Sequence, residues 1–435
     1  MGLNTILSIL LMVGFFALMF FTTADKNRLY IKYILLVSPL LGLLIIPGEL
    51  GITNFNLLSV IFILFFYRQK YVHLKGGMVY IIILILFLIA AITGAYFAES
   101  LDIDAARTAI DFITIFIFVK IFIEECLADD SFFYDVIKCL KTVLVFSIIF
   151  LGCQFVLGPS FSLVSSQNPN VLEDSLIRYP SFFIDPQTFS QFLAGTSFLC
   201  LIKEKDEEKI STKNYLLLVV SLVAIFFTGG RGGFGGWVAG FSLVVLFGNA
   251  KYRMYAIVLG VILFIIVYNF QSSFPLFTRS DDLSDSYDFR YSIWEDAFKI
   301  FLSHPIVGIG PGDYANYVSV HNPEQHWMLN NEILYFNHPE SGYLKFLVEY
   351  GALGFIALMS FILVPIGKGF LSFFKYKDTS FILLISGVVS WMAGFYTVYS
   401  LDDIRIKIMI IVFLCLLITN YKRFLPDYED AEQDI

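Results

Sequence analysis

Residues 78–97, MVYIIILILFLIAAITGAYF, form an unbroken apolar stretch without a charged side chain. A helix of roughly 20 such residues is long enough to cross the hydrocarbon core of a bilayer. Similar stretches occur along the chain of 435 residues, at 4–22, 30–47, 52–67, 108–124, 142–158, 187–202, 214–229, 232–248, 252–270, 342–366, 380–399 and 404–420. The pattern predicts an all-α polytopic membrane protein with 13 spans, in a range of about 12–14.

The composition supports this class. The chain is 57% hydrophobic and 15% charged, whereas a soluble domain carries roughly 25% charged residues. Its mean hydropathy is +0.75. The net charge of -8 and the lack of a basic patch argue against a nucleic-acid partner. The first apolar stretch has no basic segment before it and no obvious small-residue cleavage site, so we expect it to be a retained span.

The spacing of the spans predicts four regions. Residues 1–270 hold transmembrane helices 1–10, and residues 271–341 form one large outer loop with short amphipathic helices. Residues 342–420 hold helices 11–13, and residues 421–435 form a cytoplasmic tail. The five cysteines, none of them in an expected outer loop, do not suggest a disulfide framework or a metal site.

Lysine and arginine predict which loops face the cytoplasm, because cytoplasmic loops carry an excess of both. Of the 29 cations, 20 fall in one set of alternating loops and 8 in the other, while Lys345 lies within a span. The set of loops with fewer lysines and arginines, which includes the 271–341 loop, is therefore expected on the outer side of the membrane. Its members are mostly arginines, whose planar fork can hold a phosphate at two points.

Arg231 stands in the segment 228–237, TGGRGGFGGW, between two spans. Glycines let a backbone approach a ligand or another helix closely. An arginine at a helix start is unfavourable beside the positive end of the helix dipole, and a bound anion would offset that cost. The alternative is a packing turn whose arginine reaches lipid headgroups.

Two further arginines precede or follow spans on the same side. Arg178 opens 178–187, RYPSFFIDPQ. Arg290 opens 290–301, RYSIWEDAFKIF, whose aromatic residues recur at helical spacing and predict an amphipathic helix on the membrane surface. The turn that follows contains His304, which we expect to be structural, and then Gly308, Gly310 and Gly312.

The segment 338–344, HPESGYL, precedes the next span. Its His338 and Glu340 could accept a proton from a hydroxyl, or they could cap the helix and meet headgroups. A metal site built from His321 and His326 with Asp281, Asp282, Asp285 or Asp288 has no recognisable ligand spacing, so we predict no metal and expect a solvated acidic loop.

In this order, these segments resemble the O-antigen ligase and Wzy-type polysaccharide polymerase superfamily. The resemblance runs from about Arg178 to Gly354 and includes Arg231, the Arg290-x-x-x-Trp294 helix, His304-Pro305 and its glycines, and Tyr343-Leu344 before the segment 349–354, EYGALG. It implies a membrane glycosyltransferase that uses an undecaprenyl-diphosphate-linked glycan as donor at the outer face of the bacterial inner membrane. Ligases of this kind move the glycan to lipid A-core in lipopolysaccharide, whereas polymerases move it to the next lipid-linked repeat unit.

The ligase pattern places a histidine where this chain has Glu340, with His338 two residues earlier, which favours a polymerase. The resemblance implies that Arg178, Arg231 and Arg290 bind the diphosphate and that Glu340 or His338 activates the acceptor hydroxyl. Tyr343 is assigned to substrate binding. No cofactor is expected, and the partners would be the lipid-linked oligosaccharide, the bilayer and a chain-length regulator protein.

The resemblance implies a metal-independent reaction in which clustered arginines stabilise the charge of the leaving group. Two other classes stay open: a lipid-linked sugar transporter, which would place ionisable groups near the bilayer midplane, and a scaffold for assembly proteins. Within the spans, the ionisable candidates are Asp111 and the pair Lys345 and Glu349, four residues apart.

Overall fold

The computed structural model describes residues 3–43, 52–70, 72, 74, 77–98, 103–158, 161–162, 177–205, 207, 209–248, 253–254, 258, 260–261, 265, 268–269, 276, 283–324, 326–329, 332–335 and 338–425. The predicted span at 252–270 lies mostly outside these residues, as do Arg279, Asp281 and Asp282 in the outer loop and residues 426–435 of the predicted tail.

The described chain is helical apart from one small hairpin in the outer loop, so the predicted all-α membrane class is confirmed. The elements are α1 (Leu3–Phe21), α2 (Lys26–Leu36), α3 (Ser38–Leu41), α4 (Asn54–Phe65), α5 (Gly77–Phe97), α6 (Ile103–Ala128), α7 (Phe132–Leu157), α8 (Pro186–Ser197), η3 (Phe198–Leu201), α9 (Thr212–Thr228), α10 (Arg231–Phe247), α13 (Leu283–Ser303), α14 (Tyr314–His321), β1 (His326–Leu329), β2 (Glu332–Tyr335), α15 (Gly342–Tyr376), α16 (Thr379–Phe395), α17 (Ile404–Thr419) and η5 (Asn420–Phe424).

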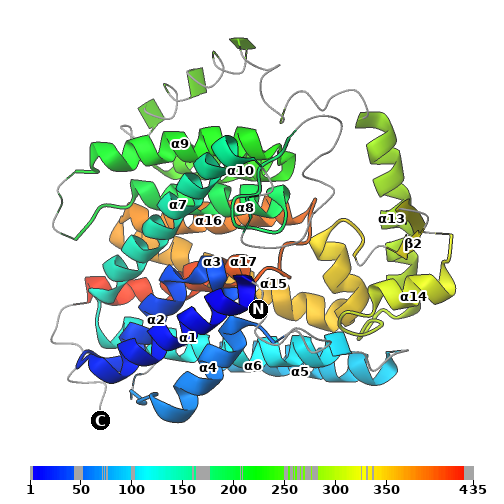
Figure 1. Cartoon of the computed structure of the whole chain (residues 1–435), viewed down its shortest axis with the longest axis horizontal. Coiled ribbons are helices and arrows are strands. Elements are labelled where there is room, and N and C mark those ends of the chain that lie inside the picture. The colour runs from blue at the N-terminus through cyan, green and yellow to red at the C-terminus, as the bar shows by residue number, and fades with distance from the viewer. Residues whose placement is uncertain are drawn as a thin grey trace.

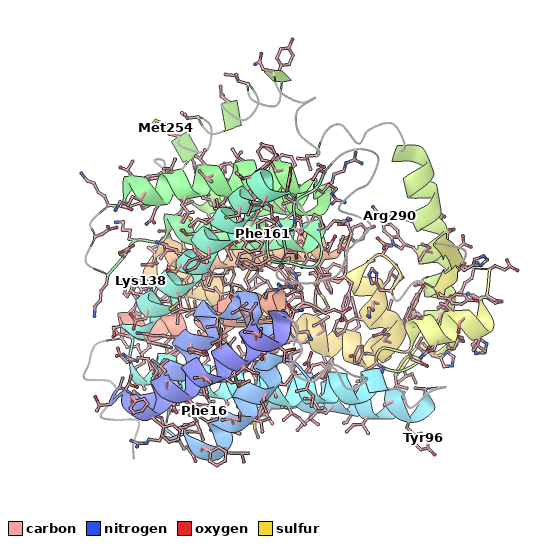
Figure 2. The ribbon with its side chains drawn as sticks, viewed as in Figure 1. Phe16, Tyr96, Lys138, Phe161, Met254 and Arg290 are labelled. Atoms are coloured by element: carbon pink, nitrogen blue, oxygen red, sulfur yellow. The ribbon has the colours of Figure 1, made fainter. Side chains whose placement is uncertain are left out.

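Among the described residues, five helical segments are long and apolar enough to cross a membrane, namely Asn4–Phe21, Gly77–Tyr96, Phe132–Leu157, Gly342–Tyr376 and Ile404–Phe424. Four shorter apolar helices, α4, α9, α10 and α16, accompany them. In Figure 1 the long helices run side by side across the picture, while α13 crosses their direction at one end. Figure 2 shows Lys138 and Arg290, which the charge pattern assigns to opposite sides of the membrane, at opposite ends of the molecule.

The helix boundaries differ from the predicted spans in four places, the first of which is that α7 begins at Phe132, ten residues before the predicted 142–158 span. The predicted 30–47 span is divided between α2 and α3, and its last residues are outside the described part. The predicted 187–202 span is the short α8 followed by the 3-10 turn η3, and almost all of its residues are buried in protein. The predicted 342–366 span continues to Tyr376 as α15. Apolar composition alone does not distinguish a helix that faces lipid from one enclosed by other helices.

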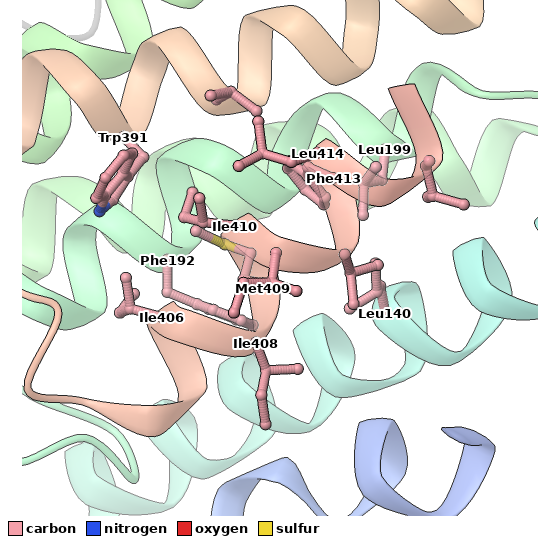
Figure 3. Packing of buried hydrophobic residues seen from close by; sticks show 14 of the residues in the cluster. Leu140, Phe192, Leu199, Trp391, Ile406, Ile408, Met409, Ile410, Phe413 and Leu414 are labelled. Carbon is pink, nitrogen blue, oxygen red and sulfur yellow. The ribbon is translucent and has the colours of Figure 1, made fainter. Parts of the chain in front are cut away.

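Helix α17 forms the centre of the bundle, since nine-tenths of its spanning window is buried. Its residues Ile406, Met409 and Phe413 lie among side chains from α7, α8 and α16, as Figure 3 shows. Because neighbouring helices surround α17, the residues at its outer end have fixed positions relative to the loops beside them.

The glycines of α10 allow this helix to pack closely on α16 and α8. A side chain at Gly236 or Gly240 would overlap the carbonyl oxygens of Ser390 or Ser386, and one at Gly233 would overlap Ser190. By contrast, Gly235 has open space around it. These glycines therefore allow the helices to approach closely, as small residues do in other membrane helix pairs.

Helix α15 is interrupted at Gly351, whose φ of 62° and ψ of -170° are not helical. The segment 304–312 fills the gap with its own backbone. Ile309 and Gly310 donate hydrogen bonds of 3.0 Å to the carbonyls of Val348 and Glu349, and Ala352 donates one of 2.8 Å to the carbonyl of Pro305. Backbone groups at membrane depth need such partners, so the glycine-rich turn and the 349–354 segment form one structural unit.

Glycine is required on both sides of this junction. Gly308, Gly310 and Gly351 all have positive φ, and side chains at Gly308 or Gly351 would overlap the backbone of the opposite segment. Any other residue at Gly308 or Gly351 would have both a disfavoured positive φ and a side chain that overlaps the opposite backbone.

Two cations counted with the outer loops are in fact held inside the bundle. The Arg405 guanidinium pairs with Asp403, donates to the carbonyl of Phe182 and is buried. Lys407 lies 2.6 Å from the Asp111 carboxylate of α6. Charges in such surroundings are retained when they are paired, and the two pairs fix the outer end of α17 to loop 177–185 and to α6.

Candidate active site at the outer end of the bundle

Arg290, His338 and Glu340 lie together at one end of the bundle. The Arg290 Nη2 atom is 3.7 Å from the Glu340 Oε2 atom, and each side chain is about one-quarter exposed. The Glu340 amide donates a hydrogen bond of 3.2 Å to His338 Nδ1, and Glu340 itself has a positive φ of 51°. A non-glycine residue in this conformation is uncommon and is associated with functional sites.

The hydrogen bond to Nδ1 has a chemical consequence for His338. A nitrogen that accepts a hydrogen bond carries no proton, so a neutral His338 has its proton on Nε2. Burial, followed by the positive charge of Lys345, lowers the pKa of His338 to about 4. His338 is therefore neutral at neutral pH and presents an Nε2–H donor, while the Glu340 carboxylate offers acceptor oxygens.

Arg178 lies against the end of α9, at the turn that leads into α10. It is buried, and its Nε atom donates a hydrogen bond of 3.0 Å to the carbonyl of Thr228. Burial raises the pKa of the nearby Asp185 carboxyl, and hydrogen bonds from the backbone of Thr188 and the charge of Arg178 oppose that rise. The structure thus brings Arg178 to the 228–231 turn, 50 residues away in the chain.

Arg231 is the first residue of α10, and its side chain is exposed. The glycines around it pack against neighbouring helices, so the packing interpretation holds for the glycines. The predicted role of Arg231 itself in phosphate binding stays a prediction.

The loop that joins α16 to α17 connects the arginine-bearing segments. Tyr396 contacts Trp294 of α13, with ring centroids 5.4 Å apart. Thr397 lies against Gly232, the residue after Arg231, and the Tyr399 ring is 6.0 Å from that of His338. This loop was missed by the sequence analysis, which placed Tyr396 and Tyr399 at the end of the predicted 380–399 span.

Tyr343, assigned to substrate binding, uses its hydroxyl inside the bundle. It donates a hydrogen bond of 2.8 Å to the carbonyl of Met392, and its ring lies edge-on to that of Phe395. This contact joins the start of α15 to α16. Substrate contact by Tyr343 stays a prediction.

Lys345, two residues further into α15, is enclosed by opposite charge. Its Nζ atom is 3.7 Å from Glu349 Oε1 and 3.7 Å from Asp402 Oδ2, and it lies 4.2 Å from the centre of the Tyr399 ring. The predicted Lys345–Glu349 pair is confirmed, and Asp402 adds a partner from the α16–α17 loop. The network holds that loop beneath His338.

A largely apolar groove begins at this network. Its volume is about 540 Å³, and it runs between α5, α6, α15 and α17. Lys345, Tyr399 and Asp402 lie at one end, and Cys415 and Ile418 of α17 lie at the other. At 1.5 Å per helical residue, the wall formed by α17 is about 21 Å long. The groove therefore joins the polar site to the apolar interior of the bundle.

Within the part of the chain that the structure describes, no group of three or more His, Cys, Asp and Glu residues is arranged to hold a metal ion. His321 lies on α14 and contacts Tyr317, and His326 begins β1. The side chains of Asp285 and Asp288 lie outside the described residues, together with Asp281 and Asp282.

These features define a multi-pass membrane protein with a polar site at one end of the bundle and an apolar groove beneath it. Residues 216–359 match the family model described as O-antigen ligase. The match confirms the resemblance to the O-antigen ligase and Wzy-type superfamily and supports a membrane glycan-modifying transferase or ligase. It covers Arg231, Arg290, His338, Glu340 and Tyr343 but not Arg178 or the α16–α17 loop. No curated protein matches the chain.

Proposed function

We propose that this protein is a polysaccharide polymerase that transfers an undecaprenyl-diphosphate-linked glycan to a second lipid-linked repeat unit at the outer face of the inner membrane. The observation that carries the proposal is the Arg290–Glu340 pair beside His338, within the segment that matches the ligase family. In this pair, a guanidinium that could bind a phosphate lies beside a carboxylate that could accept a proton from a hydroxyl.

The reaction needs three changes in bonding. The acceptor hydroxyl oxygen bonds to the anomeric carbon of the donor, the bond from that carbon to the diphosphate breaks, and the hydroxyl proton is transferred to a base. Arginines suit the leaving group because they remain charged and bind phosphate through two donors. Arg290, Arg231 and Arg178 fill this role in the proposal.

Donor binding would also prepare the base. In the absence of substrate, Arg290 pairs with Glu340. A diphosphate competes for the same guanidinium, and its arrival releases the Glu340 carboxylate toward the acceptor hydroxyl. We assign Glu340 as the base and His338 as a positioning residue, because Nδ1 of His338 accepts the Glu340 amide hydrogen and so holds the turn in its unusual conformation.

The groove supplies a place for the lipid chain. Its walls are apolar at membrane depth, and its polar end adjoins His338 through Tyr399. Part of the isoprenoid chain of the donor could enter such a groove, since passage from lipid to apolar walls exchanges one apolar environment for another. A chain held there would present its diphosphate to the arginines above.

A reconstituted reaction tests the proposal. Purified protein in lipid nanodiscs is incubated with a lipid-linked repeat unit alone, and products are separated by size. Dimers and longer oligomers support a polymerase. Transfer that requires added lipid A-core would identify a ligase instead, and a lack of any new glycosidic bond under both conditions would reject glycosyl transfer in favour of transport or scaffolding.

Variants tie the reaction to the site. Arg290→Ala and Arg231→Ala are expected to abolish long glycan chains while the protein remains at its normal level. Arg253→Ala is the matched control because Arg253 belongs to the cation set assigned to the cytoplasmic side and is exposed. Normal chain lengths with either outer variant would contradict the assignment.

A further inference from the structure

A second concave site lies on the outer loop, away from the groove. It is a hollow of about 400 Å³ between the second half of α13 and the end of α14. The lining residues are Asp296, Lys299, Ile300, Ser303, Tyr317, His321, Asn322, Pro323 and Glu324. A volume of this order is typical of small-ligand sites, and the site described above uses none of these residues.

Aromatic rings form part of its wall. Tyr317 and His321 lie with ring centroids 4.3 Å apart and an angle of 35° between their planes. His304 meets Tyr317 edge-on at 5.6 Å. The face of a sugar ring that carries C–H groups is apolar and packs on such a surface, because an aromatic ring buries a large apolar area at a fixed orientation.

Hydrogen-bonding side chains surround these rings. Asp296, Asn322 and Glu324 provide carboxylate and amide oxygens, and the Asn322 amide and the Ser303 hydroxyl add donors. Sugar hydroxyls both donate and accept hydrogen bonds, so this mixture suits them. The combination of an aromatic wall and short polar side chains distinguishes the hollow from the apolar groove.

The charges in the hollow disfavour an anionic ligand. Among the described residues that line it, Lys299 is the one lysine or arginine, and its Nζ atom lies 3.1 Å from Glu295 and 3.1 Å from Asp296. Its positive charge is therefore already balanced by two carboxylates, while Glu324 adds another negative charge to the rim. A phosphate or a uronic acid would meet net negative charge there, whereas an uncharged sugar would not.

The hollow and the candidate active site share one helix. Arg290 lies on α13 six residues before Asp296 and 13 before Ser303, which corresponds to about 9 to 20 Å along the axis at 1.5 Å per residue. Helices α13 and α14, which line the hollow, lie at the same end of the molecule as the labelled Arg290 (Figures 1 and 2). At 3.6 residues per turn, the α13 residues of the hollow lie on roughly the opposite helix face from Arg290, so a glycan that passes around α13 from the reaction site would reach the hollow.

We propose that this hollow binds a segment of uncharged oligosaccharide, as a subsite that holds the glycan chain away from the reacting bond. The inference rests on the proposed glycan-transfer function. It adds a substrate class, because the subsite selects neutral over acidic sugars, and it adds a role, because a held chain is extended more often before release.

The binding test uses the full-length protein in detergent on an array of neutral, amino and acidic bacterial oligosaccharides. Wild type should bind at least one neutral oligosaccharide. No acidic oligosaccharide should bind more tightly than that neutral one. Tyr317→Ala and Glu324→Ala should each weaken that binding at least tenfold, while Tyr317→Phe retains it. Phe298→Ala is the control, since this exposed ring lies on α13 but does not line the hollow.

Glu324 is exposed, so its replacement separates binding from folding. Unchanged binding in both variants, preference for acidic sugars, or no binding of any neutral oligosaccharide would overturn the proposal. In the polymerisation assay, Tyr317→Ala should shorten the average chain and leave the rate of the first transfer unchanged. If wild type forms no glycosidic bond, the proposed function fails, and the array alone decides whether the hollow binds sugar.

Discussion

The guanidinium of Arg290 lies 3.7 Å from the carboxylate of Glu340, and this pair joins the outer-loop helix α13 to the turn that precedes α15. The two residues are 50 positions apart in the chain. In the proposed reaction, a diphosphate that binds Arg290 competes with Glu340 for the same guanidinium. Donor binding and activation of the acceptor would then be linked through one ion pair.

Glu340→Gln should remove the base and retain the shape of the turn. We expect kcat to fall by about 10²- to 10⁴-fold, the usual contribution of general base catalysis. The KM for the donor should stay nearly unchanged, because Arg290 is intact. Steady-state kinetics with a lipid-linked repeat unit measures both values.

Glu295→Gln is the control for this change, since Glu295 lies on α13 and its side chain is more than half exposed. A wild-type kcat in Glu340→Gln would assign the base elsewhere. A loss in His338→Gln together with normal activity in Glu340→Gln would transfer the role to His338.

Gly351→Ala should destabilise the protein, because the break in α15 requires a positive φ and leaves no room for a side chain beside Ile306. A φ of 62° with a ψ of -170° is essentially confined to glycine, and such a conformation costs another residue about 1–3 kcal/mol. We expect a lower thermal midpoint in detergent and a lower yield of folded protein.

Gly367→Ala provides the comparison on the same helix. Gly367 has open space around it, and alanine is favoured over glycine in a helix by roughly 0.5–1 kcal/mol. Its midpoint should stay equal or rise. Equal stability of the two variants would show that the junction with segment 304–312 is not required.

Gly236→Ala should loosen the packing of α10 against α16, where the added methyl group would overlap the Ser390 carbonyl. Overpacked cores lose about 1–3 kcal/mol. The neighbouring Gly235→Ala should be tolerated, because nothing lies near that position. Thermal melts of the two variants provide the measurement, and identical midpoints would contradict the packing of these helices.

The neutral state of His338 makes stability depend on pH. Its pKa falls from an ordinary 6.5 to about 4 because of burial and the charge of Lys345. The unfolded chain therefore binds more protons than the folded protein between these values. The contribution of neutral His338 to the free energy of unfolding is therefore complete above pH 6.5 and is lost as the pH falls toward 4.

His338→Gln removes this dependence. The midpoint of wild type relative to His338→Gln should decline between pH 7 and pH 4 in matched detergent buffers. A difference between the two proteins that stays constant with pH would show that His338 titrates normally or is not enclosed.

The local sequence was sufficient for the membrane class, because transfer of a span into a bilayer depends on the summed hydropathy of adjacent residues. Met78–Phe97 and Ile404–Asn420 were recognised in this way, and so was the amphipathic helix that begins near Arg290. Local glycine patterns also marked 228–237 and 308–312 as special, although they did not say what the glycines approach. The same hydropathy sum overestimated α8, which is short and enclosed.

Only the tertiary structure showed what each marked residue contacts. The backbone of 304–312 completes the broken α15 at Gly351, Tyr399 joins His338 to the Lys345 network, and Lys407 pairs with Asp111 across 296 residues. These contacts depend on close packing between segments far apart in the chain, and such partners leave no periodic signal in the sequence. Sequence alone therefore determined that the chain resides in a membrane, and packing decided which of its charged residues meet.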